Sequence, residues 1–275
     1  MNVEELQVKA NDIRKDIVRM IAEAGSGHPG GSLSSADVMC ALYFGGILRH
    51  DPQNPADDAR DRFILSKGHA APALYATLAE AGYFPTEELL TLRKLGSRLQ
   101  GHPDSKKLPG VEVSTGSLGQ GLSVACGLAC GLRLAGSDAS VFCLLGDGEC
   151  QEGQVWEAAM FAAHQQADNL VAIVDHNHLQ IDGRIEDVCS PESLAEKFAA
   201  FGWEVMTCDG NDMAQVLDVL AQAKAAKGGK PTAIIAETTK GKGVSFMEGQ
   251  AGWHGKAPKP EELEIALSDL SKKEA

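Results

Sequence analysis

Three short, continuous apolar runs in the second half of the chain limit the folds that it can adopt. Each run ends at polar or glycine residues, and a stretch of helical character separates it from the next. A strand that is apolar along its whole length is buried on both faces, as in a parallel sheet covered by crossover helices. The sequence therefore predicts an α/β fold, with a parallel sheet covered by helices on both faces. The strands expected are 141–145, 170–174 and 233–236, with further strands at 63–65 and 203–207.

Helical periodicity fills most of the remaining chain. No internal repeat or shift in composition marks a boundary, so we expect one domain over residues 1–260. A polar C-terminal tail is expected over 261–275, with fraying over 268–275. Ser34 or Ser35 is a candidate cap for the second helix. The expected helices are 3–24, 34–44, 71–81, 87–94, 119–135, 154–166, 191–200 and 212–227.

Composition excludes several classes of protein. The formal net charge is −13 and no basic run is present, which argues against nucleic-acid binding. No apolar stretch approaches the roughly 20 residues of a membrane helix, and residues 1–11 do not have a signal-peptide pattern. The seven cysteines include no Cys-x-x-Cys pair, which favours reduced thiols over disulfides or zinc. We therefore expect a cytoplasmic protein without a membrane segment.

A Gly-Asp-Gly-Glu motif at residues 146–149 closes the apolar run 141–145, and Asn177 follows Asp147 by thirty positions. Glycine lets the backbone approach a phosphate, and a carboxylate oxygen is a good ligand for a hard cation such as Mg²⁺ or Ca²⁺. Asn177 offers a second oxygen. The pattern predicts a clamp for a metal and a diphosphate, although the motif alone also fits a plain strand-to-helix turn.

Four histidines stand beside glycine in expected loops, and a glycine-rich segment at 115–121 opens the helix expected at 119–135. An imidazole can exchange a proton near neutral pH, whereas a single loop histidine is more often structural. The glycine-rich helix entry fits either an anion site or tight packing. The four histidines are His28, His69, His102 and His254.

Longer strings around the clamp resemble the thiamine diphosphate fingerprint of transketolases. They are Gly-Asp-Gly-Glu-Cys-Gln-Glu-Gly at 146–153, Val-Trp-Glu-Ala at 155–158, Asp-His-Asn-His-Leu at 175–179 and Ile-Asp-Gly at 181–183. The resemblance covers nearly the whole chain, and it implies thiamine diphosphate as cofactor with Mg²⁺, or alternatively Ca²⁺ or Mn²⁺. The metal ligands that it implies are Asp147, Asn177 and the carbonyl of Leu179.

The same resemblance implies roles for other residues. It places His69 and His254 near the diphosphate, and His28 and His102 near the sugar hydroxyls and the reacting carbon. It places Glu152 in an acidic network at a dimer interface, although acids in a first helical turn commonly just face water. Further cofactor contacts are implied for Gly116, Leu118, Gly146, Gly148, Glu149 and Ile181, an apolar residue whose alternative place is the core.

In transketolases, the glutamate that activates the cofactor belongs to a separate pyrimidine-binding domain. The resemblance therefore implies the amino-terminal subunit of a split transketolase, completed by a C-terminal subunit in an α2β2 assembly. The implied reaction is reversible transfer of a two-carbon ketol unit from a ketose phosphate to an aldose phosphate. Xylulose 5-phosphate, a sulfonated sugar and a branched sugar all remain candidate donors.

Three alternative functions remain. Two are other enzymes that use a related Gly-Asp-Gly…Asn clamp, and one is a protein without catalytic activity. The first is an alpha-type subunit of a 2-oxo acid dehydrogenase or decarboxylase, and the second is a deoxyxylulose phosphate synthase. The third is a degenerate cofactor-binding domain retained for assembly or regulation. The four histidines and the string over 146–157 favour a transketolase.

Overall fold

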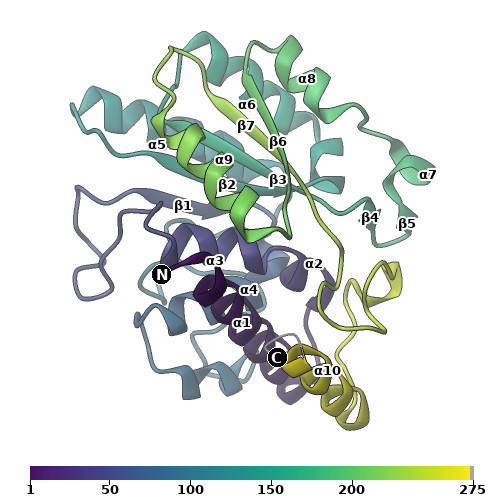
Figure 1. The fold of residues 1–275 in the computed structure, drawn as a ribbon. Helices are drawn as coiled ribbons and strands as arrows, with labels where there is room; N and C mark the ends of the chain where they lie inside the picture. Colours follow the sequence, from purple (N-terminus) through teal and green to yellow (C-terminus); the bar gives the residue numbers. More distant parts are fainter. Residues whose placement is uncertain (273–275) are drawn as a thin grey trace.

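A five-stranded parallel sheet forms the centre of the computed structural model, which describes residues 1–272 (Figure 1). Its strands run in the order β1-β2-β3-β7-β6, and every neighbouring pair is parallel. The predicted α/β fold is confirmed. The strands are β1 (Arg62–Leu65), β2 (Val141–Gly146), β3 (Leu170–His176), β6 (Glu204–Asp209) and β7 (Thr232–Glu237), and a small antiparallel pair joins β4 (Leu179–Gln180) to β5 (Gly183–Arg184).

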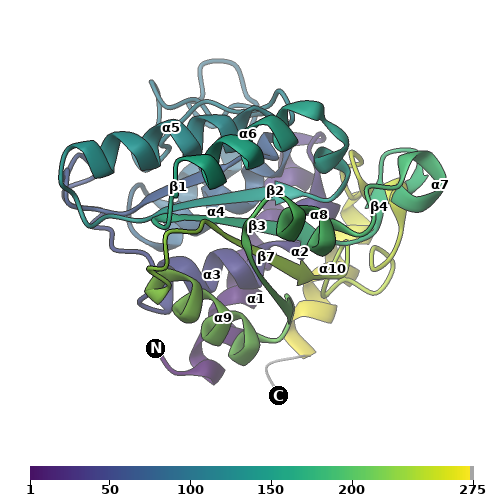
Figure 2. The same ribbon diagram turned by 90° about the horizontal axis from the view of Figure 1, so that it is seen from above.

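Helices cover both faces of the sheet, as Figure 2 shows with the sheet seen edge-on. Alternate strand residues point to opposite faces, which divides the interior into two apolar clusters. One cluster holds Phe142 and Ile173 against α1 (Val3–Ala24), α3 (Ala36–Phe44), α4 (Ala71–Glu80) and α9 (Met213–Ala225). The other holds Cys143 and Ala172 against α5 (Gln120–Leu134), α6 (Gly153–His164) and α8 (Leu194–Ala200).

Several expected elements differ in the structure. The helix expected over 34–44 is α3, which begins at Ala36, and a short helix that was not expected, α2 (Pro29–Ser34), precedes it. Ser35 stands at the cap position of α3, but its hydroxyl donates to the Gly31 carbonyl (2.7 Å) and does not cap the helix. The segment expected at 87–94 is a 3₁₀ helix, Thr86–Thr91, and the helix expected at 191–200 begins only at Leu194. Helix α7 (Ile185–Cys189) follows β5.

The C-terminal segment is more ordered than the sequence suggested. Residues 268–272, which the sequence predicted to fray, form the end of α10 (Pro260–Lys272), and this helix lies beside α1. Ala266 and Leu270 of α10 are buried, because apolar residues four apart lie on the same helical face. Residues 273–275 of the predicted tail lie outside the described part, and the division at residue 260 stays a prediction.

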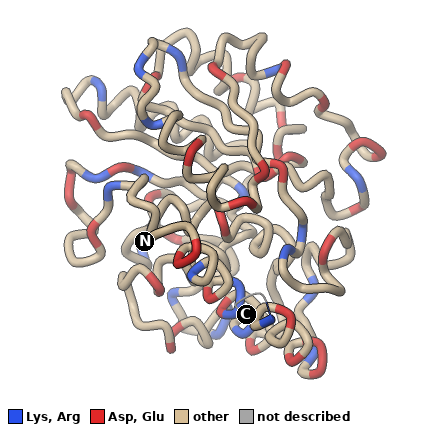
Figure 3. The backbone as a smooth tube through the Cα atoms, in the orientation of Figure 1, with Lys and Arg blue, Asp and Glu red and all other residues tan. Residues whose placement is uncertain are grey.

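The distribution of charged residues and the state of the cysteines agree with what the composition predicted. Acidic residues are spread along the whole backbone with basic residues between them (Figure 3). All seven cysteines are unpaired. Within residues 1–272, no helix has both the length and the apolar character that crossing a bilayer needs.

Candidate functional site

A cavity of about 330 Å³ opens at the carboxyl ends of β1, β2, β3 and β7. Loops at this edge of a parallel sheet converge because all the strands point the same way, and ligands of such folds bind there. Every site residue predicted from the sequence lines the cavity except His102. The predicted lining residues are His28, His69, Gly116, Leu118, Gly146, Asp147, Gly148, Glu149, Glu152, Asn177, Leu179, Ile181 and His254.

The predicted metal ligands come together at the ends of β2 and β3. The Asp147 carboxylate accepts hydrogen bonds from the backbone of Gly148 (2.7 Å) and His178 (2.5 Å), which fix its orientation. The side-chain oxygen of Asn177 accepts from the Leu179 N–H (3.2 Å). Carboxylate, amide and carbonyl oxygens are the donors that Mg²⁺ prefers, so the set fits a hard divalent cation. Burial, together with the Asp175 carboxylate, raises the pKa of Asp147 to about 6, and a bound cation would favour the ionised form.

A buried lysine, Lys240, faces the same oxygens. Its ammonium donates to the Leu179 carbonyl (3.1 Å) and contacts Nδ1 of His254 (3.0 Å). Burial lowers the pKa of Lys240 to about 8, against the opposing effect of the Asp147 charge. No carboxylate in the described part of the chain forms a salt bridge with it at 4 Å or less. A buried ammonium next to oxygen donors and glycine backbone is well suited to an anionic phosphate.

Replacing this lysine separates ligand binding from folding. Lys240→Met is expected to weaken binding of Mg²⁺-diphosphate by about 10- to 100-fold, since it removes one charged hydrogen bond. The free energy of unfolding of the ligand-free chain should not fall, because the variant removes a charge whose burial is unfavourable. Titration calorimetry and urea unfolding measure the two effects, and exposed Lys230→Met is the control. Unchanged diphosphate affinity would exclude a role for Lys240 in binding.

Three of the four predicted histidines form one cluster at the cavity. The ring centroids of His28, His69 and His254 lie 5.0–5.4 Å apart. Burial lowers the pKa of all three, to about 4 for His28, about 2 for His69 and about 3 for His254. Nearby cations add to the shift, from Arg93 at His28, Lys67 at His69 and Lys240 at His254. The rings are therefore neutral at pH 7, and each offers one donor and one acceptor nitrogen.

The shift at His69 predicts acid sensitivity. Below the ordinary histidine pKa of about 6.5, this histidine is protonated in the unfolded chain, whereas in the folded protein it stays neutral until about pH 2. Protons therefore favour the unfolded chain, and the free energy of unfolding falls as the pH falls. His69→Gln should make this loss shallower by up to about 1.4 kcal/mol per pH unit between about pH 6 and 4. Urea unfolding at several pH values measures the slope. The matched control is His164→Gln, an exposed histidine at the end of α6, and identical slopes for both variants would contradict the prediction.

Glu149 holds the walls of the cavity together. Its carboxylate accepts from the Ser66 hydroxyl (2.5 Å) and from the backbone of Gly119 (2.9 Å) and Gly146 (3.0 Å). With both oxygens used in this way, Glu149 positions the loops after β1 and β2 and the start of α5. We infer that its predicted part in cofactor binding is indirect.

Close packing explains one glycine near the cavity, and backbone conformation explains another. A Cβ at Gly68 would lie 2.7 Å from the backbone nitrogen of Gly116, so the two loops meet only without a side chain there. Gly119, at the start of α5, has φ of +83°, a conformation that favours glycine. The glycine-rich segment 115–121 is therefore tightly packed, and it also forms part of the cavity wall.

The remaining predicted residues lie at the edge of the cavity. His102 is not among the lining residues, and its ring lies behind Gly116, where a Cβ would meet it at 2.9 Å. Arg93 lies near Nδ1 of His28 (3.4 Å). Ile181 is 68% exposed although it is apolar, and Glu152 is exposed at the start of α6. Their roles, and the partner contacts implied for Glu152, stay predictions.

From the sequence, no site role was expected for two buried lysines, Lys67 and Lys240. Lys67 pairs with Asp175 (2.5 Å) under the cavity and donates to the Gly31 carbonyl (3.0 Å). The sequence signal is their position, because Lys67 comes two residues after β1 and Lys240 three residues after β7. Other lining residues without a predicted role are Gly31, Gln151, Gln180 and Asp182.

Comparison with known proteins decides the family. Residues 6–272 match the family model described as "Transketolase, thiamine diphosphate binding domain". The chain belongs to the transketolase family. It is 44% identical over 271 residues to the 6-deoxy-6-sulfo-D-fructose transketolase subunit of Clostridium sp. (strain MSTE9), and the match covers 98% of each protein. It is 45% identical over 271 residues to an apulose-4-phosphate transketolase subunit of Actinobacillus succinogenes, covering 98% of this chain and 97% of that protein.

A solved structure agrees with this assignment. The transketolase of Campylobacter jejuni superimposes with a TM-score of 0.92 at 37% identity, over 98% of this chain and 43% of the longer protein. The chain is thus an amino-terminal transketolase-type subunit with thiamine diphosphate as its cofactor. The predicted family, fold, cofactor and transferase class are confirmed. These matches favour the transketolase over the 2-oxo acid dehydrogenase, deoxyxylulose phosphate synthase and degenerate-domain alternatives.

Proposed function

We propose that this transketolase subunit holds the diphosphate end of thiamine diphosphate together with Mg²⁺. The observation that carries the proposal is the cavity in which Asp147, Asn177 and the Leu179 carbonyl converge beside Lys240. The oxygens would hold the metal, and Lys240 would neutralise part of the diphosphate charge. Thiamine diphosphate supplies, when bound, the carbon nucleophile that cleaves the ketose next to its carbonyl.

The neutral histidine cluster would handle the substrate. With depressed pKa values, His28, His69 and His254 act as uncharged donors and acceptors beside the cofactor. They can orient sugar hydroxyls and take part in proton transfer. His102, behind Gly116, would act at the outer end of the same channel.

A second subunit is part of the proposal. The two relatives described above are named as transketolase subunits, and they align with this chain over nearly their whole length. We propose that the partner supplies the pyrimidine-binding domain and the activating glutamate in an α2β2 assembly. A cytoplasmic location, consistent with the seven free cysteines, and a place in carbohydrate metabolism such as the pentose phosphate pathway belong to the same proposal.

The reaction proposed is transfer of a two-carbon ketol unit from a ketose phosphate to an aldose phosphate. The relatives' names refer to 6-deoxy-6-sulfo-D-fructose and apulose 4-phosphate, so sulfonated and branched sugars are the rival donors. The test incubates the reconstituted complex with xylulose 5-phosphate and each rival donor, with ribose 5-phosphate as acceptor. Mass spectrometry should show an acceptor lengthened by two carbons. In a parallel incubation with a 2-oxo acid, release of carbon dioxide without any ketol transfer from the sugars would overturn the proposal.

A further inference from the structure

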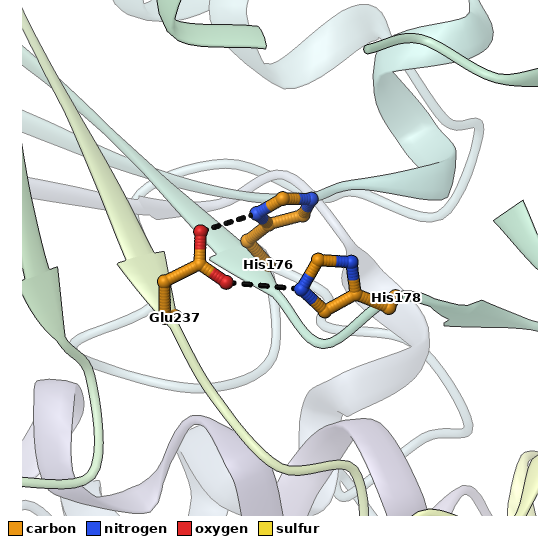
Figure 4. Close-up of side chains that lie close together, drawn as sticks. All are labelled: His176, His178 and Glu237. Carbon is orange, nitrogen blue, oxygen red and sulfur yellow. Dashed lines mark hydrogen bonds and ion pairs between the residues drawn. The ribbon is translucent and has the colours of Figure 1, made fainter. Parts of the chain in front are cut away.

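A second cluster of metal-ligating side chains lies just outside the cofactor cavity (Figure 4). His176 ends β3 and Glu237 ends β7, and the two residues are direct partners in the parallel register of these strands. His178 follows two residues later, in the loop that leads to β4. None of the three lines the cofactor cavity.

Both imidazoles point a nitrogen at the same carboxylate. Nδ1 of His176 lies 2.8 Å from one oxygen of Glu237, and Nε2 of His178 lies 3.0 Å from the other. The ring centroids are 4.0 Å apart, and one ligand atom from each residue lies within 4.8 Å of the others. In a tetrahedral zinc site, bonds of about 2.0–2.1 Å place neighbouring ligand atoms about 3.3 Å apart, which small side-chain rotations would reach here.

We propose that His176, His178 and Glu237 form a zinc site, with water completing the shell. Two imidazoles and one carboxylate form a ligand set that zinc uses in proteins. Imidazole also distinguishes this site from the cofactor metal site, whose oxygen donors suit Mg²⁺. His176 and His178 flank Asn177 in the chain, and the two sites share no ligand.

The outer nitrogens of the two rings support this assignment. Nε2 of His176 lies 2.8 Å from the Glu192 carboxylate, and Nδ1 of His178 lies 3.3 Å from that of Glu186. A metal-bound histidine characteristically donates its other N–H to a carboxylate or carbonyl, which fixes the ring and makes it a stronger ligand. Here both histidines have such a partner, and both partners come from the segment that carries α7.

The site is open to incoming metal. His176 is buried, whereas the side chains of His178 and Glu237 are 40% and 51% exposed. A metal bound here would fasten the loop after β3 to the end of β7. Through Glu192 and Glu186 it would also order the projecting segment of β4, β5 and α7, which is visible at the side of the molecule in Figure 1. A bound zinc would therefore hold this segment in place beside the cofactor cavity.

Zinc binding to the full-length chain tests the site independently of turnover. Titration calorimetry with ZnCl₂ in excess Mg²⁺ should show one zinc per wild-type chain. His178→Ala and Glu237→Gln change exposed side chains, which favours normal folding, and each should weaken zinc binding by at least about 100-fold. Glu192→Gln should weaken it by about 10- to 100-fold, as expected for a positioning residue.

Two controls locate the metal. His164→Ala, an exposed histidine on α6, should leave zinc affinity unchanged. His254→Ala should also leave it unchanged, which excludes the histidine cluster of the cavity. Co²⁺ in place of zinc should give visible absorption bands of a four- or five-coordinate site, and His178→Ala should remove them. Absence of zinc binding by the wild-type chain, or unchanged binding in both His178→Ala and Glu237→Gln, would overturn the proposal.

Discussion

Purified alone and given thiamine diphosphate, Mg²⁺, a ketose phosphate and an aldose phosphate, the chain is expected to show no ketol transfer above background. The reason is visible among the acids of the cavity within residues 1–272. Asp147 is a ligand of the proposed metal site and Glu149 accepts three internal hydrogen bonds, while Glu152 and Asp182 are exposed. None is a buried carboxyl free to face the cofactor's pyrimidine, and loss of such an acid typically costs about 10²–10⁴-fold in rate.

Adding the complementing subunit should restore activity. The rate of product formation, followed by chromatography of the sugar phosphates, should rise with partner concentration and level off when the complex is saturated. A partner variant in which the activating glutamate is changed to glutamine serves as the control and should assemble without restoring turnover. Substantial turnover by this chain alone would show that its own residues complete the active site.

Strands and glycine motifs were accessible from the sequence because their physical signals are local. The continuous apolar runs at 141–145 and 170–174 fit a strand buried on both faces, and the structure has β2 and β3 there. Gly146 and Gly148 flank Asp147 at the end of such a run, which predicts close backbone approach at the sheet edge. The cavity confirms that these residues lie together, because strand ends of a parallel sheet converge.

The buried lysines could not be found in this way, because burial of a charge is a property of the assembled sheet. Lys240 stands in the segment Lys-Gly-Lys-Gly, which is typical of a solvated loop. Its burial depends on β7 pairing with β3, which places the chain after β7 over the cavity. Lys67 likewise becomes buried only when β1 joins β2 and brings it against Asp175.

The histidines beside Asn177 illustrate the same limit. In the sequence, His176 and His178 are only parts of a string that resembles a cofactor fingerprint. Glu237 lies about sixty residues further on, and its approach to both rings follows from the register of β3 with β7. Pairing of strands distant in the sequence, rather than any local pattern, creates this cluster.

Asp147→Ala is expected to abolish retention of thiamine diphosphate in the complex with the partner subunit. The variant removes the only charged ligand proposed for the metal, which leaves the neutral oxygens of Asn177 and Leu179. A divalent cation bound through neutral oxygens alone cannot offset the diphosphate charge as well, so we expect cofactor affinity to fall by at least about 100-fold. Gel filtration followed by assay of bound thiamine diphosphate measures retention, and calorimetry gives the affinity.

A matched control removes the same charged group at a site away from the cavity. Asp187→Ala removes an exposed carboxylate from α7 and should leave cofactor retention unchanged. Stability provides a second criterion: burial raises the pKa of Asp147, so its carboxylate is less stable in the cofactor-free protein than in water. Asp147→Ala should still fold without cofactor, yet gain no stability when thiamine diphosphate and Mg²⁺ are added. If Asp147→Ala retained thiamine diphosphate as well as the wild type does, the metal would have to bind elsewhere in the cavity. A carboxylate that binds the metal cannot be removed without weakening the binding of the metal and the cofactor.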